Sequence, residues 1–361
     1  MIIRQLCSSY ARALTAPLAV MLVLAACGGG AASPAESASA AGSASASSPS
    51  TAASSSSDCT AVELQAGHDS SVEHPYQAGL EAFAEALDQE TDGQVTLEIF
   101  PDAQLGDEAS MIEGLSLGTV DVVVTSTPPL SSFSEKIELL SLPFLAEDLE
   151  HNYRILDGEV GDTLADELAE PTNGIVLGWY FAGQRNVWNS ERPINTPADL
   201  EGLKIRTQES PVQIATFNAM GAQAVPMSFG ELYQALQTGV VDGADNDPVD
   251  VLTEKFYEVT TYYSMTGHFF LNSALMLSSD TFGQLCQAQQ DAVMVAAEES
   301  VRVERETQEG LVEDAISELE GFGIEFNEVP DKAPFQELVQ SVYDEFEEQI
   351  GADLIQAARD S

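Results

Sequence analysis

The sequence predicts an α/β protein built from two lobes. Short apolar segments alternate with amphipathic ones along most of its 361 residues, a pattern typical of β-sheets that are covered by helices. The chain is longer than one hydrophobic core usually fills. After residue 58 the sequence contains neither a low-complexity linker nor a repeat of fixed period. We therefore expect two lobes that share continuous strands and helices.

The first 27 residues have the pattern of a bacterial export signal. Two arginines precede the apolar run Leu18–Leu24, which is too short to span a bilayer. The following tetrapeptide, LAAC at residues 24–27, resembles the lipobox at which lipoproteins are cleaved and acylated. The sequence thus predicts that residues 1–26 are a signal peptide and that Cys27 carries lipid, with two or more acyl chains needed for stable anchorage.

A flexible tether is expected between the lipid and the folded part, over residues 27–58. Residues 28–57 are almost entirely Gly, Ala, Ser and Pro, with no large apolar side chain. Such a segment cannot offset the entropy lost on ordering, and its end-to-end distance should be about 30 Å. The protein is expected to be exported, at the outer face of the cytoplasmic membrane or in the periplasm.

Two cysteines, Cys59 and Cys286, remain in the folded part. The oxidising space outside the cytoplasm permits a disulfide that would close a very long loop. The sequence does not show whether the two residues are close together, so two free thiols remain the alternative. Neither a metal site nor a redox CxxC motif is indicated.

The charge of the chain excludes one class of partner. Asp and Glu number 59 against 13 Lys and Arg, for a formal net charge of −46. Nucleic acid requires a basic face, and anionic lipid would repel this surface, so membrane contact is expected through the lipid anchor only. Within this acidic chain, four bases fall close together at Arg185, Arg192, Lys204 and Arg206. Because arginine offers a fixed, permanently charged fork, the cluster suggests an anion site.

The expected elements of the first half begin with a strand at 61–67. Pro75–Glu90 carries apolar residues at helical spacing and ends at a Thr-Asp-Gly stop signal, and Gln94–Phe100 alternates as a half-buried strand should. The remaining predictions for this half are helices at 111–117 and 147–170 and strands at 120–125 and 174–180.

The second half continues the alternation and contains the longest expected helix. Asp280–Glu320 is acidic with little to interrupt it, and Gly321 and Gly323 follow. The other predictions are strands at 204–206, 224–226, 240–244, 267–278 and 324–329, helices at 211–220 and 229–238, and a closing helix.

Six segments in a specific order and spacing resemble one known family. They are HPYQAGLEAFAEALDQETDGQVTLEIFPDAQLGDE, GLSLGTVDVVV, LSLPFLAED, GWYFAGQRNVWN, PINTPADLEGLKIRT and GAQAVPMSFGELYQALQTGVVDGADN. They cover nearly the whole exported domain. The resemblance is to the solute-binding proteins of tripartite ATP-independent periplasmic (TRAP) transporters, the DctP-like family.

The resemblance implies a periplasmic-binding-protein-like fold. Two lobes with mixed β-sheets flanked by helices would be joined by hinge strands and one long connecting helix, with the ligand cleft between the lobes. Lobe I would comprise residues 59–183 plus 272–311, and lobe II residues 184–271 plus 312–361.

The resemblance also implies roles for four residues. Arg206 matches the arginine that grips the ligand carboxylate, although by itself it could pair with a surface acid such as Glu201 or Glu209. Arg185 matches a second pocket arginine, Phe229 an aromatic that packs on the ligand, and Asn246 a polar wall residue. The family often has Glu-Asn-Pro at this point, whereas the chain reads DNDP from Asp245, which puts the role of Asp245 in doubt.

Softer candidates lie at the ends of strands and in adjoining loops, where ligands bind in open α/β sheets. Each has a structural alternative, as a capping, loop, core or hinge residue. These candidates are His68, Asp107, Thr125 and Trp188, with Asp69, His74, Ser126 and His268 as further positions.

The function expected from the resemblance is capture of a small organic acid and its delivery to the integral membrane subunits of a TRAP permease. No cofactor is expected. The sequence has no GxSxG, HExxH or P-loop motif, so an enzyme is not expected. The alternative is a two-lobed binding protein for an ABC permease or for a ligand-sensing system.

Overall fold

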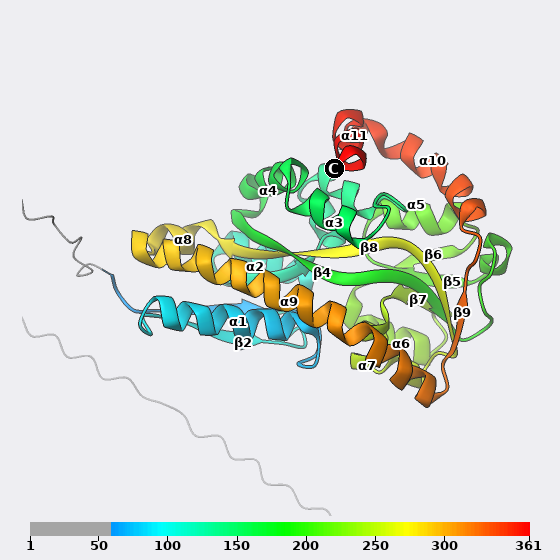
Figure 1. Ribbon diagram of the computed structural model, residues 1–361, viewed down its shortest axis with the longest axis horizontal. Helices are drawn as coiled ribbons and strands as arrows, with labels where there is room; N and C mark the ends of the chain where they lie inside the picture. Colours follow the sequence, from blue (N-terminus) through cyan, green and yellow to red (C-terminus); the bar gives the residue numbers. More distant parts are fainter. Residues whose placement is uncertain (1–58) are drawn as a thin grey trace, which may run out of the picture. The chain divides into compact units, whose positions relative to one another are not determined.

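The computed structural model describes residues 59–361, and the expected signal peptide, Cys27 and tether lie outside them. A nine-stranded sheet has the order β2-β1-β3-β8-β4-β7-β5-β6, and β9 pairs with β8. The long antiparallel strands β4 (Gly174–Asn189) and β8 (Tyr262–Ser278) lie in its middle and take part in both ends (Figure 1). The α/β prediction is confirmed, and the sheets expected in two lobes are parts of one mixed sheet.

The first end of the sheet contains β1, which pairs in parallel with β2 and β3, while β3 runs antiparallel to β8. Helix α1 begins at Pro75 and buries Leu80, Phe83 and Leu87, as its apolar spacing predicts. The elements of this end are β1 (Val62–Gly67), α1 (Pro75–Glu90), β2 (Val95–Phe100), α2 (Glu108–Leu117), β3 (Val122–Ser126), α3 (Leu149–Leu156) and α4 (Glu159–Thr172), with 3₁₀ turns at Pro128–Ser132 and Glu135–Ser141.

The second end contains β5, which pairs in parallel with β6 and β7, while β7 runs antiparallel to β4. Its elements are β5 (Lys204–Thr207), α5 (Pro211–Ala219), β6 (Gln223–Pro226), α6 (Leu232–Gln237), β7 (Gly243–Asn246) and α7 (Pro248–Thr253), with 3₁₀ turns at Pro197–Leu200, Phe229–Glu231 and Phe256–Glu258. The strand expected at 240–244 starts three residues later, because the N–H of Val240 closes the end of α6 on the carbonyl of Ala235.

The central strand β4 is irregular where it passes from one end of the sheet to the other. Its register against β8 shifts between Phe181 and Gln184 and again between Arg185 and Val187. Gly183 adopts a φ of +90°, and a Cβ built there would lie 2.3 Å from the Cβ of Asp247. A side chain is therefore excluded at this bulge, which brings β4 against the start of α7.

The long acidic helix expected over 280–320 is two helices. Helix α8 (Ser279–Gln284) ends at Leu285, and α9 (Gln287–Phe322) begins after Cys286, whose backbone is extended with ψ of 160°. Gly283 lies in the last turn of α8, and no proline marks the break. Cys286 forms a disulfide with Cys59, and the two Cα atoms lie 5.5 Å apart. Helix α9 then lies along α1, β4 and α7 (Figure 1).

The C-terminal elements are β9 (Glu325–Glu328), α10 (Ala333–Ile350) and α11 (Ala352–Asp360). Helix α10 packs on both α5 and the 3₁₀ turn at Glu135–Ser141, and α11 packs on α4. Apolar side chains from these elements, among them Leu139, Phe217, Phe335 and Phe346, form one large core cluster. The C-terminal helices thus contact elements of both ends of the sheet.

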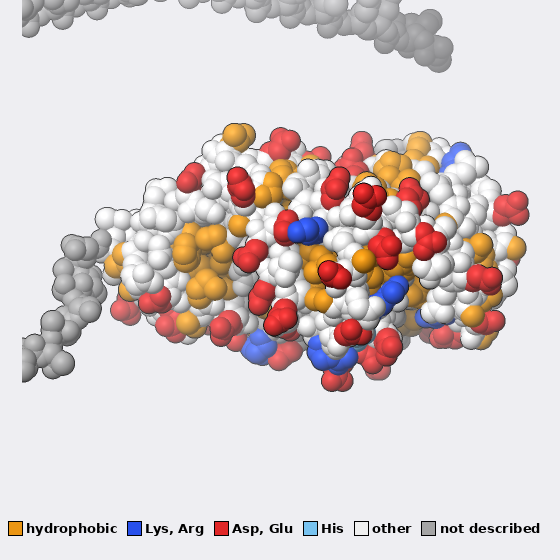
Figure 2. Space-filling model, turned by 90° about the horizontal axis from the view of Figure 1, so that it is seen from above, with side chains coloured by type: hydrophobic (Ala, Val, Ile, Leu, Met, Phe, Trp, Pro, Cys, Tyr) orange, Lys and Arg blue, Asp and Glu red, His pale blue; other side chains and the backbone are white. Residues whose placement is uncertain are grey.

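The surface is rich in acid, as the composition requires. Figure 2 shows red Asp and Glu side chains distributed over the visible face, with few Lys and Arg among them. Within residues 59–361, no helix combines the length and the apolar composition needed to cross a bilayer.

Candidate ligand-binding site

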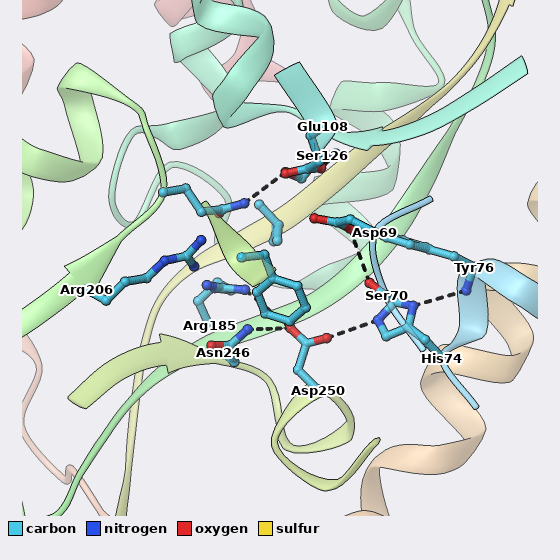
Figure 3. Close-up of a pocket in the computed structure, with 13 residues that line it drawn as sticks. Asp69, Ser70, His74, Tyr76, Glu108, Ser126, Arg185, Arg206, Asn246 and Asp250 are labelled. Carbon is cyan, nitrogen blue, oxygen red and sulfur yellow. Dashed lines mark hydrogen bonds and ion pairs between the residues drawn. The ribbon is translucent and has the colours of Figure 1, made fainter. Parts of the chain in front are cut away.

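A cavity lies where the carboxyl ends of β1 and β3 face those of β5, β6 and β7, the usual place for ligands in open α/β sheets. About 300 Å³ of space free of protein atoms, part of it open to solvent, lies among the lining residues. Figure 3 shows side chains from both ends of the sheet pointing into it. The lining residues are Asp69, Ser70, His74, Tyr76, Glu108, Ser126, Arg185, Arg206, Gln208, Phe229, Asn246, Asp250 and Leu271.

Arg206, on β5, presents a partly unpaired guanidinium to the cavity. Its Nε and Nη2 donate to the carbonyl of Met227 at 3.0 and 2.9 Å, and its Cζ lies 5.7 Å from the ring centroid of Phe229. Its Nη1 is buried and has no hydrogen-bond partner in the described part of the chain. Burial and the nearby Arg185 lower the pKa of Arg206 to about 10, so the side chain is still charged at neutral pH.

Arg185, on β4, is occupied by two acids of the second end. Its Nε lies 3.2 Å from Oδ2 of Asp245, and its Nη1 lies 3.5 Å from Oδ2 of Asp250. His268 contacts the same Asp245 oxygen through Nε2 at 3.1 Å. Burial opposes ionisation of Asp245, but the charge of Arg185 and the hydrogen bond from His268 outweigh it and hold the pKa of Asp245 well below its usual range. Arg185 therefore lines the cavity with its charge already balanced.

A chain of hydrogen bonds joins α7 to the start of α1 across the floor of the cavity. His74 caps α1 through Nδ1, which accepts the N–H of Tyr76 at 3.2 Å, and its Nε2 lies 3.0 Å from Oδ1 of Asp250. The Nδ2 of Asn246 donates to Oδ2 of Asp250 at 2.5 Å. Both oxygens of Asp250 are thus engaged, and Figure 3 shows the bonds that converge on it.

Two further carboxyl groups, those of Glu108 and Asp69, face the cavity from the first end of the sheet. Glu108 accepts the backbone N–H of Ser126 and the hydroxyl of the same residue, the latter at 2.9 Å. Burial raises the pKa of Glu108 against the effect of these bonds. Burial, together with the charges of Glu108 and Glu254, raises the pKa of Asp69 well above its usual value. Both shifts favour the neutral acid.

The structure brings together seven of the candidate residues predicted from sequence, among them the softer candidates Asp69, His74 and Ser126. Arg206, Arg185, Asn246 and Phe229 all line the cavity. Arg206 does not pair with the surface acids Glu201 or Glu209; within residues 59–361 no carboxylate lies within ion-pair distance of it.

Four predicted residues, His68, Asp107, Thr125 and Trp188, do not line the cavity, and neither does the further candidate His268. Trp188 lies in the core and stacks on Phe256 with ring centroids 5.2 Å apart. His68 is buried against Gln77 at 3.0 Å, and burial lowers its pKa to about 4. Thr125 donates to Glu108 at 3.3 Å. Asp107 caps α2 by accepting the N–H of Ser110 at 2.9 Å, and it lines a smaller neighbouring space.

Sequence reasoning missed Glu108, Gln208 and Asp250 as lining residues. Gln208 follows Arg206 at the end of β5, and its Nε2 donates to the hydroxyl of Ser126 at 2.8 Å. Because residues two positions apart on a strand point to the same face, the position of Arg206 could have indicated that Gln208 also faces the cavity. The two acids carried no usable signal, because the chain contains 59 Asp and Glu residues.

A resident metal has no evident place in the described part of the chain. No group of three or more His, Cys, Asp and Glu side chains between residues 59 and 361 is arranged to hold an ion. The carboxyl groups of the cavity instead hydrogen-bond to neighbouring side chains and backbone amides.

Comparison with known proteins identifies the relatives of this chain. Residues 66–349 match the family described as bacterial extracellular solute-binding protein, family 7, DctP. A solute-binding protein of Chromohalobacter salexigens is 36% identical over 273 residues, which are 76% of this chain and 81% of the relative. The 2,3-diketo-L-gulonate-binding periplasmic protein of Escherichia coli is 34% identical over 305 residues, 83% of this chain and 92% of the relative.

Solved structures agree with the sequence comparisons. A TRAP periplasmic solute-binding protein from a Sulfitobacter species, crystallised with bound β-D-galacturonate, superposes with a TM-score of 0.80. It is 33% identical in sequence, and the match covers 83% of this chain and 100% of that one.

Proposed function

Because the chain belongs to family 7 of the bacterial extracellular solute-binding proteins, we propose that it captures a small organic acid outside the cytoplasm and delivers it to a TRAP-type membrane permease. The observation that carries this proposal is the guanidinium of Arg206, buried in the cavity with one Nη lacking a partner among the described residues. A buried charged donor without a partner is costly, and a carboxylate from a ligand would pair with it.

The names of the relatives support an acid as the ligand. The Escherichia coli relative is named for 2,3-diketo-L-gulonate, and the Sulfitobacter structure holds galacturonate. Both compounds carry a carboxylate. That group is the feature that a single guanidinium fork recognises best.

Capture requires binding and closure, without a chemical step. Arg206 orients the carboxylate, the ring of Phe229 packs against the ligand, and Asn246 and the balanced Arg185 line the cavity beside Arg206. We assign residues 59–183 plus 272–311 to lobe I and residues 184–271 plus 312–361 to lobe II. The ligand then lies between the lobes, and closure excludes water, which strengthens each polar contact.

Delivery takes place at the membrane surface. We propose that residues 1–26 are removed and that Cys27 is acylated, so that residues 27–58 tether the binding domain to the outer face of the cytoplasmic membrane. The closed, loaded form then meets the integral membrane subunits of the permease. The tether increases the local concentration of the binding domain near those subunits.

A thermal-shift screen of the purified protein against small carboxylates and their neutral analogues tests the proposal. A ligand present at one hundred times its Kd stabilises the folded state by about 2.7 kcal/mol, which is a clear shift in Tm. Arg206→Ala should abolish the shift. Lys204→Ala is the matched control, because Lys204 is an exposed cation two residues away on β5 and should keep it.

Two outcomes would contradict this proposal. A carboxylate that stabilises Arg206→Ala as strongly as the unchanged protein would place the anion site elsewhere. Stabilisation by neutral analogues alone would show that the ligand is not an acid.

A further inference from the structure

Among the described residues, one cation of the cavity is available for a ligand. Arg185 is paired with Asp245 and Asp250 at 3.2 and 3.5 Å, and the ring of His74 is held by Asp250 at 3.0 Å. Arg206, by contrast, has no ion pair within the described part of the chain. One bound carboxylate therefore uses all of the positive charge that is free in the cavity.

The side of the cavity opposite Arg206 is built from carboxyl groups. Figure 3 shows Asp69 reaching into the cavity from the side opposite Arg206, with Glu108 above it. No positively charged side chain in the described residues pairs with either acid. A second ligand carboxylate at this side would lose its hydration without gaining a cation, which is strongly unfavourable.

The same side can instead satisfy hydroxyl groups. Carboxyl oxygens accept hydrogen bonds from hydroxyls, and in the neutral form a carboxyl group also donates one. Asn246 adds a buried Oδ1 with no hydrogen-bond partner among residues 59–361. This acceptor requires a donor, which a hydroxyl has and a carboxylate lacks.

The remaining wall is also polar. Of the thirteen lining residues, Phe229 and Leu271 alone have purely hydrocarbon side chains, and Ser70, Ser126 and Gln208 add neutral hydrogen-bonding groups. An apolar acid would leave these groups without partners. A ligand with several hydroxyls would satisfy them.

From these observations we infer that the site selects polyhydroxylated monocarboxylates, such as aldonates and uronates, over dicarboxylates, with Asp69 and Glu108 as the residues that set this specificity. The inference rests on the proposed function, since it takes Arg206 as the carboxylate anchor. Asp69 and Glu108 then contact the hydroxyls remote from that carboxylate. The burial that raises the pKa of Glu108 supports a neutral, hydroxyl-binding carboxyl.

Isothermal titration with matched ligand pairs tests this inference on the purified protein. D-Gluconate and D-glucarate differ in one end group, CH₂OH against carboxylate, and D-galactonate and galactarate form a second pair. Succinate serves as a dicarboxylate without hydroxyls. At least one monocarboxylate should bind ten or more times tighter than its dicarboxylate partner and than succinate, a ratio consistent with one unpaired charge.

Substitution of the two acids gives an independent readout. Asp69→Asn and Glu108→Gln keep the size of the side chain and remove its charge. Each should therefore reduce the ratio of the Kd of the dicarboxylate to the Kd of its monocarboxylate partner by about threefold or more. Glu113→Gln is the matched control, because Glu113 is an exposed acid on the same helix as Glu108. It should leave the ratio unchanged.

The outcomes separate this inference from the function on which it rests. Binding of D-glucarate, galactarate or succinate as tightly as the monocarboxylates would overturn the inference and leave capture of an acid intact. Unchanged ratios in both Asp69→Asn and Glu108→Gln would remove these residues as the specificity determinants. If none of the acids binds, capture of a small hydroxy or dicarboxylic acid is itself overturned.

Discussion

Arg185 and Asp245 form a buried ion pair behind the ligand cavity, with Nε of the arginine 3.2 Å from Oδ2 of the aspartate. Both side chains are almost completely inaccessible to solvent, at 1% and 0% exposure. His268 and Asp250 extend the pair on either side. The departure of the chain from Glu-Asn-Pro left the role of Asp245 in doubt. In the structure this residue holds Arg185 and does not itself line the cavity.

The two cavity arginines should respond differently to substitution. Arg185→Gln leaves two buried carboxylates without their cation and should lower the free energy of unfolding by about 3 to 5 kcal/mol. Arg206→Gln removes a cation that has no ion pair among the described residues, so it should abolish acid binding with little loss of stability. Urea unfolding monitored by tryptophan fluorescence measures the first effect and titration with a bound acid the second. Equal losses of stability in both variants would contradict this division of roles.

Glu304 should make stability depend on pH. This side chain of α9 is fully buried and accepts the N–H of Phe181 at the β4 bulge at 3.0 Å. Burial raises its pKa to about 8 from 4.5, so between these values the folded state holds a proton that the unfolded state has released. Its contribution to stability should therefore fall as pH rises from about 4.5 to 8, by about 1.4 kcal/mol per pH unit.

The variant Glu304→Gln isolates this dependence, because glutamine still accepts the N–H of Phe181 and cannot ionise. Its free energy of unfolding should equal that of the unchanged protein near pH 4.5 and exceed it increasingly up to about pH 8. A difference that does not change with pH would mean that Glu304 does not titrate in this range.

Gly183 should tolerate no side chain. Its φ of +90° disfavours any other residue, and a Cβ would collide with Asp247, which caps α7 and holds Gln308 of α9 at 2.6 Å. Gly183→Ala should cost more than about 2 kcal/mol of stability and weaken acid binding through the displaced α7. Gly239→Ala is the control: its φ is +72° with open space around it, so it should cost about 1 kcal/mol from backbone strain alone. Equal costs would show that the contact with Asp247 is unimportant.

The disulfide between Cys59 and Cys286 should stabilise the fold without affecting the ligand. The residues are 227 positions apart, and closing so long a loop in the unfolded chain is worth about 5 kcal/mol. The double variant Cys59→Ser, Cys286→Ser should unfold at lower urea concentration and keep its ligand affinity, because neither cysteine lines the cavity. An unchanged unfolding midpoint would contradict this expectation, and the reduced protein provides a second comparison.

The break between α8 and α9 shows where local sequence loses its predictive power. Residues 280–320 contain no proline. Gly283 lies near Leu285, but a glycine alone does not mark the break, because Gly310 lies in the uninterrupted interior of α9. The chain turns at Cys286, which is bonded to a residue 227 positions away. By contrast, α1 agrees with the helix predicted around Pro75–Glu90, because the Thr-Asp-Gly stop after Glu90 is a local signal.

Site residues divide in the same way. Arg206 stood out because cations are scarce in this chain, whereas Glu108 and Asp250 were indistinguishable from the many surface acids. Trp188 was predicted near the ligand and lies in the core against Phe256, because the packing of the second end of the sheet, and not its position near Arg185, decides where the indole points.

The sequence alone determined the α/β class, the order of nearly all strands and helices, and the family, because these depend on local periodicity and on motifs in fixed order. Tertiary structure alone decided that the two expected sheets are one, that Arg185 is balanced while Arg206 has no ion pair among the described residues, and that Glu108 faces the cavity beside Asp69. The last two of these properties depend on which charged groups come within a few ångströms of one another. Electrostatic energies fall with distance in space, and distance in space is fixed only when both ends of the sheet close around the cavity.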